Sequence, residues 1–368
     1  MNIAATKSRS LVGTSGAVAS ILLVVLALIT ALAVAIAIML VSGVSTEGAF
    51  IALRSLAIGA FGSPQGLSET LVASTPLIIA GAAFIVGARA GLFNIGLEGQ
   101  LLVGGMAGLV AGFSCPGLPT VVHIPLALAC AFTAGAMWSG LAGWMKVSSG
   151  AHEVITTIML NFVALRFVEF LLRNPPVQNP DRSDPISRSV LDSAALPQLL
   201  GWVDPSLRVN FGFLLALGAA LAVAFLLWRT KLGFEIRVMG ASPMAGRVAG
   251  MSPAKTIILA MMISGGIAGL AGASLTLGVL GRATPGFTGG LGFEAIAVAL
   301  LARLHPVGVV FSGILFGGLI AGGRQMSVVA DVSIDLVTVI EAIVLLFIAA
   351  PILIKRLYPF VFQSGKEV

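Results

Sequence analysis

The chain has 368 residues, of which 58% are hydrophobic and only 10% are charged, and its formal net charge is +6. About a quarter of the residues of a soluble domain are charged, because its surface must stay hydrated. This composition therefore excludes an ordinary soluble domain and predicts an all-α integral membrane protein. The basic residues lie between apolar segments rather than on one face, so they indicate orientation signals for membrane insertion and not a nucleic acid partner.

Apolar segments along the chain predict a bundle of about ten transmembrane helices. The first, 17–42, would span roughly 39 Å, which exceeds the bilayer core. It also exceeds the apolar core of a signal peptide, so it is expected to be an uncleaved helix. The other nine predicted spans lie near 69–88, 95–113, 123–145, 153–172, 210–228, 256–280, 291–304, 306–323 and 336–354.

The distribution of lysine and arginine predicts which loops face the cytoplasm. With the amino terminus inside, all six lysines fall on the cytoplasmic side. Segment 229–255 is then a cytoplasmic loop and segment 173–208 an external one. Both termini are expected in the cytoplasm, with tails at 1–16 and 355–368 flanking a transmembrane domain at 17–354.

Segment 229–255 also predicts a short cytoplasmic helix. Ser242 followed by Pro243 is typical of a helix start, and Gly250 is a plausible stop before Pro253. The result is a helix of roughly two turns, too short to span a membrane. Its small and apolar side chains suit docking into a groove of another protein, and a plain connector is the alternative.

Polar side chains at membrane depth are candidate pathway residues, because such groups are costly in lipid and are usually functional. Asn94, Glu98 and Gln100 lie among glycines at or inside a helix start. They are predicted to line a pathway or gate, and a capped interfacial loop is the alternative.

A second polar group lies in the span at 153–172. Glu153, Thr157 and Asn161 recur every four residues, so they share one helix face that should point into the bundle. On the same helix Arg166 and Glu169 are expected to form a surface ion pair.

The eighth predicted span is short and is followed closely by Pro306, which would interrupt a continuing helix. Backbone freed in this way is tolerated only against protein or a wet cavity. Glu294 follows a glycine-dense stretch in this span, which favours a lined cavity. A satisfied structural carboxylate is the alternative.

Several sequence motifs are incomplete and exclude other chemistry. A zinc-protease motif beginning at His152 fails because its fifth position is Thr156, and a phosphate-binding loop ending at Lys366 fails because Phe360 stands at its first glycine. Segment 13–16 mimics a serine-protease motif but lies in the predicted tail. We expect no catalytic residue, metal or cofactor. Cys115, in a short loop, and Cys130, within a helix, indicate no disulfide framework.

A weak internal repeat joins two glycine-rich segments, GGMAGL at 104–109 and GGIAGL at 265–270. A genuine duplication would produce it. Similar packing needs of two helices in lipid would produce it as well.

Four segments in order resemble the ABC permease family that includes ribose, branched-chain amino acid and nucleoside permeases, most closely its simple-sugar and nucleoside importer branch. They are GLFNIGLEGQ at 91–100, HEVITTIMLN at 152–161, RVMGASPMAGRVAGMSP at 237–253 and TPGFTGGLGFEAIAVALLARLHPVGVV at 284–310. The likeness covers most of the chain from about residue 68. His305, before Pro306, departs from the small or polar residues expected there, which puts any detailed role for His305 in doubt.

The resemblance implies an inner-membrane permease subunit that pairs with a second permease, two cytoplasmic ATP-binding subunits and an external substrate-binding protein. It implies that Ser242–Gly250 is the coupling helix that docks on the ATPase. The residues expected to serve coupling are Arg237, Gly240, Ser242, Pro243, Met244, Ala245, Gly246 and Gly250, and those expected near the pathway are Asn94, Glu98, Gln100, Glu153, Thr157, Asn161 and Glu294.

The expected mechanism is alternating access driven by ATP hydrolysis on a partner. A secondary transporter coupled to protons or sodium, with the intramembrane glutamates as carriers, is the alternative. The substrate is expected to be a nucleoside or a simple sugar. The chain has one Tyr and four Trp and shows no visible platform for stacking a base.

Overall fold

The computed structural model describes residues 12–330, 332–349 and 351–358. These residues form α-helices with two short π-helical segments, η1 (Ile58–Gly62) and η2 (Thr276–Leu280). The α-helices are α1 (Val12–Val41), α2 (Thr46–Ala57), α3 (Pro64–Arg89), α4 (Leu97–Ser114), α5 (Thr120–Ser149), α6 (Glu153–Leu172), α7 (Phe211–Arg229), α8 (Lys231–Ala241), α9 (Pro243–Val248), α10 (Pro253–Leu275), α11 (Leu291–Leu301), α12 (Gly308–Ala330), α13 (Ile334–Ala349) and α14 (Pro351–Leu357).

Within the described residues, seven helical stretches are long and apolar enough to cross a membrane. They are α3, α4, α5, α6, α7, α10 with η2, and α12. The prediction of an all-α membrane protein is confirmed, and each of the ten predicted segments contains helix. The number of crossings and the sides of the termini stay predictions.

Three features of the helices differ from the simplest expectation. The loop predicted at 229–255 contains an eleven-residue helix, α8, before the short helix α9, and α2 lies in a stretch predicted as a connection. Helix α11 has eleven residues. It is therefore roughly 17 Å long, about half the hydrocarbon thickness of a bilayer.

The chain divides into two compact units. One contains the described residues up to Ser55 and from Gly323 onward, and in it α1 packs against α13 and α14. The hydroxyl groups of Thr30 and Tyr358 share a hydrogen bond of 2.9 Å in this unit. The second unit, Leu56–Gly322, contains all the residues predicted to serve the pathway and coupling.

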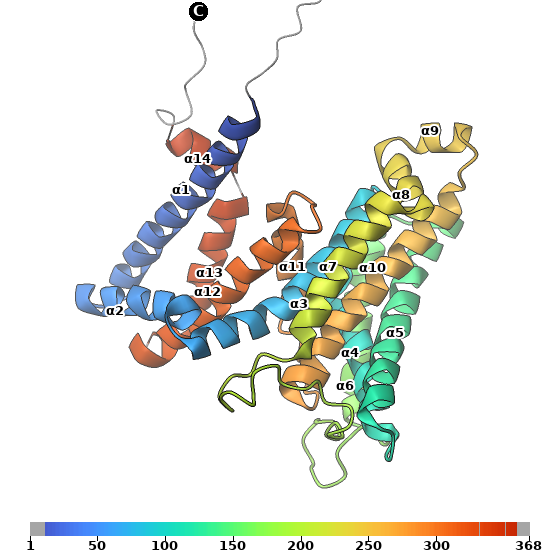
Figure 1. Cartoon of the computed structure of the whole chain (residues 1–368), viewed down its shortest axis with the longest axis horizontal. Helices are drawn as coiled ribbons and strands as arrows, with labels where there is room; N and C mark the ends of the chain where they lie inside the picture. Colours follow the sequence, from blue (N-terminus) through green and yellow to red (C-terminus); the bar gives the residue numbers. More distant parts are fainter. Residues whose placement is uncertain (1–11, 331, 350, 359–368) are drawn as a thin grey trace, which may run out of the picture. The chain divides into compact units, whose positions relative to one another are not determined.

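The core of the second unit is a contact among α4, α5 and α10, which lie side by side (Figure 1). Backbone meets backbone there because the facing residues are glycine: a methyl group on any of them would overlap a neighbouring chain atom. We call these residues the glycine seam: Gly104, Gly135, Gly265, Gly269 and Gly272. Small residues of this kind let helices approach closely in lipid, where no hydrophobic force drives them together.

The two segments of the internal repeat pack against each other in this seam, with Gly104 of α4 directly on Gly269 of α10. Their likeness thus coincides with a shared packing requirement.

The connection between α6 and α7 lies at the opposite end of this unit from α9 (Figure 1). Isolated bridges pair Gln178 with Ser187 and Gln198 with Asn210. Arg182 donates two hydrogen bonds to the Asp184 carboxylate and so holds the pKa of that carboxyl below its usual value. Asn210 caps the start of α7 by accepting from Gly212 N at 2.9 Å.

Candidate functional site

The α3–α4 connection brings several of the predicted polar residues together. Helix α3 ends at Arg89, and Gly91 follows with φ of +74°, the left-handed conformation that glycine commonly supplies just past a helix end. Helix α4 begins only at Leu97. The intervening backbone is not helical, so its polar groups need partners from elsewhere in the protein.

Asn94 supplies one set of these partners. It is fully buried, and its side-chain nitrogen donates to Gln100 Oε1 at 3.1 Å and to Ser264 Oγ at 3.0 Å. Its side-chain oxygen accepts from Gly96 N and from Gln100 Nε2, each at 3.0 Å. Ser264 in turn donates to the Ala83 carbonyl at 2.8 Å. The network thus fastens the connection to α3, α4 and α10.

Asn161 of α6 supplies a second set. Its amide nitrogen donates to the Ile95 carbonyl at 3.0 Å, and its oxygen accepts from Gly99 N at 2.9 Å. Gly99 N lies in the first turn of α4, where backbone donors have no partner within the helix. Thr157 is also buried but donates to the Glu153 carbonyl of its own helix at 2.7 Å. The polar face of α6 points into the protein, as predicted from its spacing.

Glu98 binds the start of α11. One carboxylate oxygen accepts from Thr288 Oγ1 and from Gly290 N at 3.1 Å, and the other accepts from Gly292 N at 2.8 Å. A methyl group at Gly292 would lie only 2.5 Å from Glu98 Cα, so α11 begins in direct contact with α4. Glu294, in the first turn of α11, is half-buried.

Glu153 lies apart from this group, at the turn between α5 and α6. Its carboxylate forms a 2.6 Å ion pair with Lys146, and His152 Nδ1 is 3.9 Å away. Arg166 and Glu169 form the predicted surface ion pair at 2.7 Å. The seven predicted pathway residues are therefore not one cluster. Asn94, Gln100, Thr157 and Asn161 surround the α3–α4 connection, Glu98 and Glu294 lie at the start of α11, and Glu153 lies at the α5–α6 turn.

Helices α8 and α9 form an arm beyond the ends of α7 and α10 (Figure 1). Ser242 caps α9 by accepting from Ala245 N at 3.3 Å, Pro243 opens the helix, and Gly250 follows it with φ of +76°. The predicted short helix and its start are confirmed. On α9, Met244 is 69% exposed and Val248 is 85% exposed.

The base of the arm contacts the α3–α4 connection. A side chain at Gly240 would overlap the Arg89 carbonyl oxygen, and one at Gly91 would lie 3.2 Å from Gly240 Cα. Gly246 of α9 packs on Met239 of α8. The Nε of Arg237 is buried without a hydrogen-bond partner among the described residues.

Two sets of groups in this region are not identified by the sequence: Arg89, and the groups that bind the predicted residues. Arg89 is one of the basic residues between apolar segments, for which the sequence indicates only an orientation signal, yet it donates to the Leu304 carbonyl from Nε at 3.2 Å and from Nη2 at 2.8 Å. Ser264 and the Gly290–Gly292 backbone bind predicted residues. His305 lies in the turn after α11, 5.0 Å from the ring centre of Trp228. A lone arginine at a helix end was the one signal available for Arg89.

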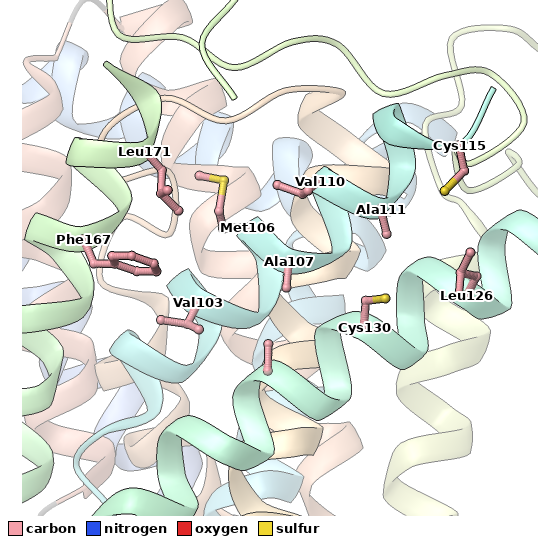
Figure 2. Close-up of a pocket in the computed structure, with 11 residues that line it drawn as sticks. Val103, Met106, Ala107, Val110, Ala111, Cys115, Leu126, Cys130, Phe167 and Leu171 are labelled. Atoms are coloured by element: carbon pink, nitrogen blue, oxygen red, sulfur yellow. The ribbon is translucent and has the colours of Figure 1, made fainter. Parts of the chain in front are cut away.

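A cavity of about 550 Å³ opens between α4, α5 and α6 (Figure 2). Apolar side chains and the two thiols line it: Val103, Met106, Ala107, Val110, Ala111, Cys115, Leu126, Cys130, Ala134, Phe167 and Leu171. A binding site for a polar solute needs placed hydrogen-bonding groups. This cavity therefore does not suit a sugar or a nucleoside.

Comparisons with known proteins match most of the chain to permease components of transport systems. A family model described as the permease component of branched-chain amino acid transport systems matches residues 66–349. The guanosine ABC transporter permease protein of Bacillus subtilis is 39% identical over 91% of this chain and 94% of its own.

Two further relatives cover most of the chain. The glucose ABC transporter permease protein of Haloferax volcanii is 38% identical over 80% of this chain and 78% of its own. The nucleoside ABC transporter permease protein of Lactococcus lactis is 32% identical, with 83% and 85% covered. No solved structure gives a significant match. With seven helices able to cross a bilayer in its described part, the chain is a multi-pass protein of the inner membrane. It belongs to the family of permease components of branched-chain amino acid transport systems.

Proposed function

We propose that the chain is the membrane-spanning permease subunit of an ATP-driven ABC importer for nucleosides. The observation that supports this most is the 39% identity to a guanosine permease across nearly the full length of both chains. The 32% identity to a nucleoside permease points to the same substrate class.

The proposed topology places both termini in the cytoplasm and about ten helices in the membrane. Tails at 1–16 and 355–368 flank the transmembrane domain at 17–354. Two observations support this arrangement: the lysines cluster on one proposed side, and α9 and the α6–α7 connection lie at opposite ends of one unit (Figure 1). Helix α11 would then be a half-helix inside the bundle, as found near substrate paths in transporters.

The proposed partners are a second permease, two cytoplasmic ATP-binding subunits and an external binding protein. The chain has no phosphate-binding loop, so hydrolysis belongs to a partner. The exposed Met244 and Val248 of α9 supply an apolar surface for docking on the ATP-binding subunit. Closure of the ATPase pair on ATP would move this arm and exchange an outward opening for an inward one.

Among the residues proposed for the pathway, Glu294 is the best placed to meet a solute, because its side chain retains exposure in the first turn of α11. Glu98 holds the start of that helix through the backbone of Gly290 and Gly292. Asn94, Gln100, Thr157 and Asn161 are buried in hydrogen bonds within the chain. We propose that these four shape the pathway from behind, and that Glu153 does so from the cytoplasmic end.

Uptake by the complete complex in proteoliposomes tests the substrate. Radiolabelled guanosine, adenosine and glucose would be offered with ATP inside the vesicles. We expect saturable nucleoside uptake that excess unlabelled glucose does not reduce. Uptake of glucose without nucleoside uptake would instead establish a sugar permease, a second candidate supported by the 38% identity to a glucose permease.

The same vesicles distinguish an ATP-driven importer from an ion-coupled carrier. We expect no accumulation when the ATP-binding subunits are omitted, even with a proton or sodium gradient imposed. Accumulation by this chain and its permease partner alone would contradict the proposal.

The role of α9 is tested by Val248→Glu, which introduces a charge into the proposed apolar contact. We expect loss of ATPase binding in a pull-down, with the permease still folded. Val248→Thr keeps the shape and is the matched control. Gly246→Trp is a poorer test because the new side chain would collide with Met239 and disturb the arm itself.

A further inference from the structure

Helix α11 is held at each end by a charged side chain of opposite sign. At its amino end the Glu98 carboxylate accepts from the backbone of Gly290 and Gly292. Just past its carboxyl end the Arg89 guanidinium donates twice to the Leu304 carbonyl. The first and last turns of a helix have unpaired backbone groups, and the helix dipole favours an anion at the amino end and a cation at the carboxyl end. Both charges have the favourable sign.

Both charges come from one stretch of chain, residues 89–98. The stretch joins the end of α3 to the start of α4, and both of these helices pack against α11. The stretch is in turn fixed to α10 through Ser264 and to α6 through Asn161.

The Arg89 contact is made with the turn that follows α11. Arg303 and Leu304 have φ of +52° and +55°, a conformation that disfavours residues other than glycine. The carbonyl that Arg89 binds belongs to this strained turn. Next to it, His305 packs on Trp228 at the end of α7, which leads directly into the arm.

We propose that Arg89 and Glu98 are positioning residues that clamp α11 between them, so that α11 and the α8–α9 arm move as one body. The contact of Gly240 with Arg89 and Gly91 joins the arm to the same stretch. The inference rests on the proposed function, in which the arm docks on an ATPase. It assigns to Arg89 and Glu98 the role of transmitting the movement of the arm to α11, and not the role of contacting solute.

Distances between spin labels test the clamp without relying on transport. Labels at Phe293→Cys on α11 and Phe234→Cys on α8 of the arm, an exposed residue outside the proposed docking surface, would be introduced after replacing Cys115 and Cys130 with serine. In the complete complex in lipid nanodiscs we expect the same label-to-label distance distribution with and without ATP. A shift of its maximum on ATP binding would overturn the proposal, because the two elements would then move separately.

Charge removal is the second arm of the test. A label at Met137→Cys provides a reference point on α5, a helix of the core contact, for measuring the position of α11. The Met137 side chain is 71% exposed, so a label there does not disturb the packing. We expect Arg89→Gln and Glu98→Gln each to broaden the distribution of distances between labels at Met137→Cys and Phe293→Cys. Arg89→Lys keeps the positive charge and should give a narrower distribution than Arg89→Gln. Arg166→Gln removes the same charge from a surface ion pair and should leave the distribution unchanged. Wild-type distributions in both clamp variants would overturn the proposal.

Coupling gives a separate readout. In the clamp variants we expect uptake to fall at least tenfold while ATP hydrolysis stays within twofold of wild type, so the ratio of solute to ATP drops. Equal loss of both rates with unchanged distances would assign Arg89 and Glu98 to assembly instead. If nucleoside uptake were absent in the wild type but the distances behaved as expected, the proposed substrate would fail and the clamp would stand.

Discussion

The glycine seam and the 89–98 stretch hold the same unit together by different means. In the seam, helical backbones of α4, α5 and α10 touch because five glycines leave no side chain between them. Between Arg89 and Leu97 the chain leaves helical geometry. Side-chain amides satisfy backbone groups there and in the first turn of α4, and the Glu98 carboxylate satisfies those at the start of α11. Regular helices in lipid need only close packing, whereas irregular backbone there needs a partner for every polar group.

The difference predicts how each region responds to substitution. A substitution in the glycine seam introduces steric overlap that the closely packed helices cannot relieve, so its cost in stability is large. A substitution at the 89–98 stretch removes one hydrogen bond at a time, so the loss of stability should increase with the number of bonds removed.

The largest effect is expected from Gly272→Val in the seam. A side chain there would overlap the Leu101 carbonyl and lie 2.8 Å from Gly105 N, so α10 would have to separate from α4. Overpacking of this kind costs about 3 kcal/mol of unfolding free energy. Unfolding by SDS titration in micelles measures it.

Gly218→Val is the matched control. Gly218 lies in the middle of α7 and has no atom within 4 Å of the position a Cβ would take. It should unfold at close to the wild-type SDS concentration. Equal losses at Gly272 and Gly218 would contradict the seam as a special contact.

A smaller effect is expected from Asn161→Asp at the 89–98 stretch. The change keeps the acceptor for Gly99 N but replaces the donor to the Ile95 carbonyl with an oxygen. Leaving a buried carbonyl unpaired costs about 1–3 kcal/mol. The same SDS titration checks it.

Thr157→Val separates burial from this particular bond. Thr157 is on the same face and equally hidden, but its hydroxyl bonds only to its own helix. We expect a loss below about 1 kcal/mol, since no partner outside the helix is left unpaired. If Thr157→Val lowered stability as much as Asn161→Asp, the polar face of α6 as a whole, and not the Asn161 hydrogen bonds to Ile95 and Gly99, would determine stability.

Much of the helical architecture could be predicted from the sequence, because length and apolarity identify membrane helices without knowledge of their neighbours. Each of the ten predicted segments contains helix. Helices α2 and α8 were missed because they are short and carry charges, for example Glu47 and Arg54 in α2. Nothing in composition separates such helices from loops.

The sequence identified the polar side chains of the site but not the groups that they bind. Asn94, Glu98 and Asn161 were identifiable as polar groups among apolar ones, and the structure buries or pairs all three. Their partners are mostly backbone groups, such as Gly292 N and the Ile95 carbonyl, which every residue possesses. The sequence contains no signal for which backbone group a side chain will reach, so the role of Arg89 was also missed.

A third prediction concerns the strained turn that Arg89 binds. Arg303 is exposed and has φ of +52°, so Arg303→Gly should remove a conformational cost of about 1 kcal/mol. Arg303→Ala removes the same arginine side chain but keeps the Cβ, and it is the proper reference. We expect the glycine variant to be the more stable of the two by SDS titration. Inside α11 the order should reverse, with Leu300→Gly less stable than Leu300→Ala, because glycine weakens a helix interior.

The smallest effect on stability is expected at the ion pair of Lys146 with Glu153. It tests whether every charged contact in this unit contributes as much to stability as that of Glu98. The pair is close, at 2.6 Å, but the Lys146 side chain is 28% exposed. Partial hydration weakens such pairs to about 1 kcal/mol or less. A double-mutant cycle with Lys146→Met and Glu153→Gln, read by SDS titration, measures the interaction directly. A coupling energy of about 3 kcal/mol or more would be typical of a desolvated pair, and would place the α5–α6 turn in the same class as the clamp on α11.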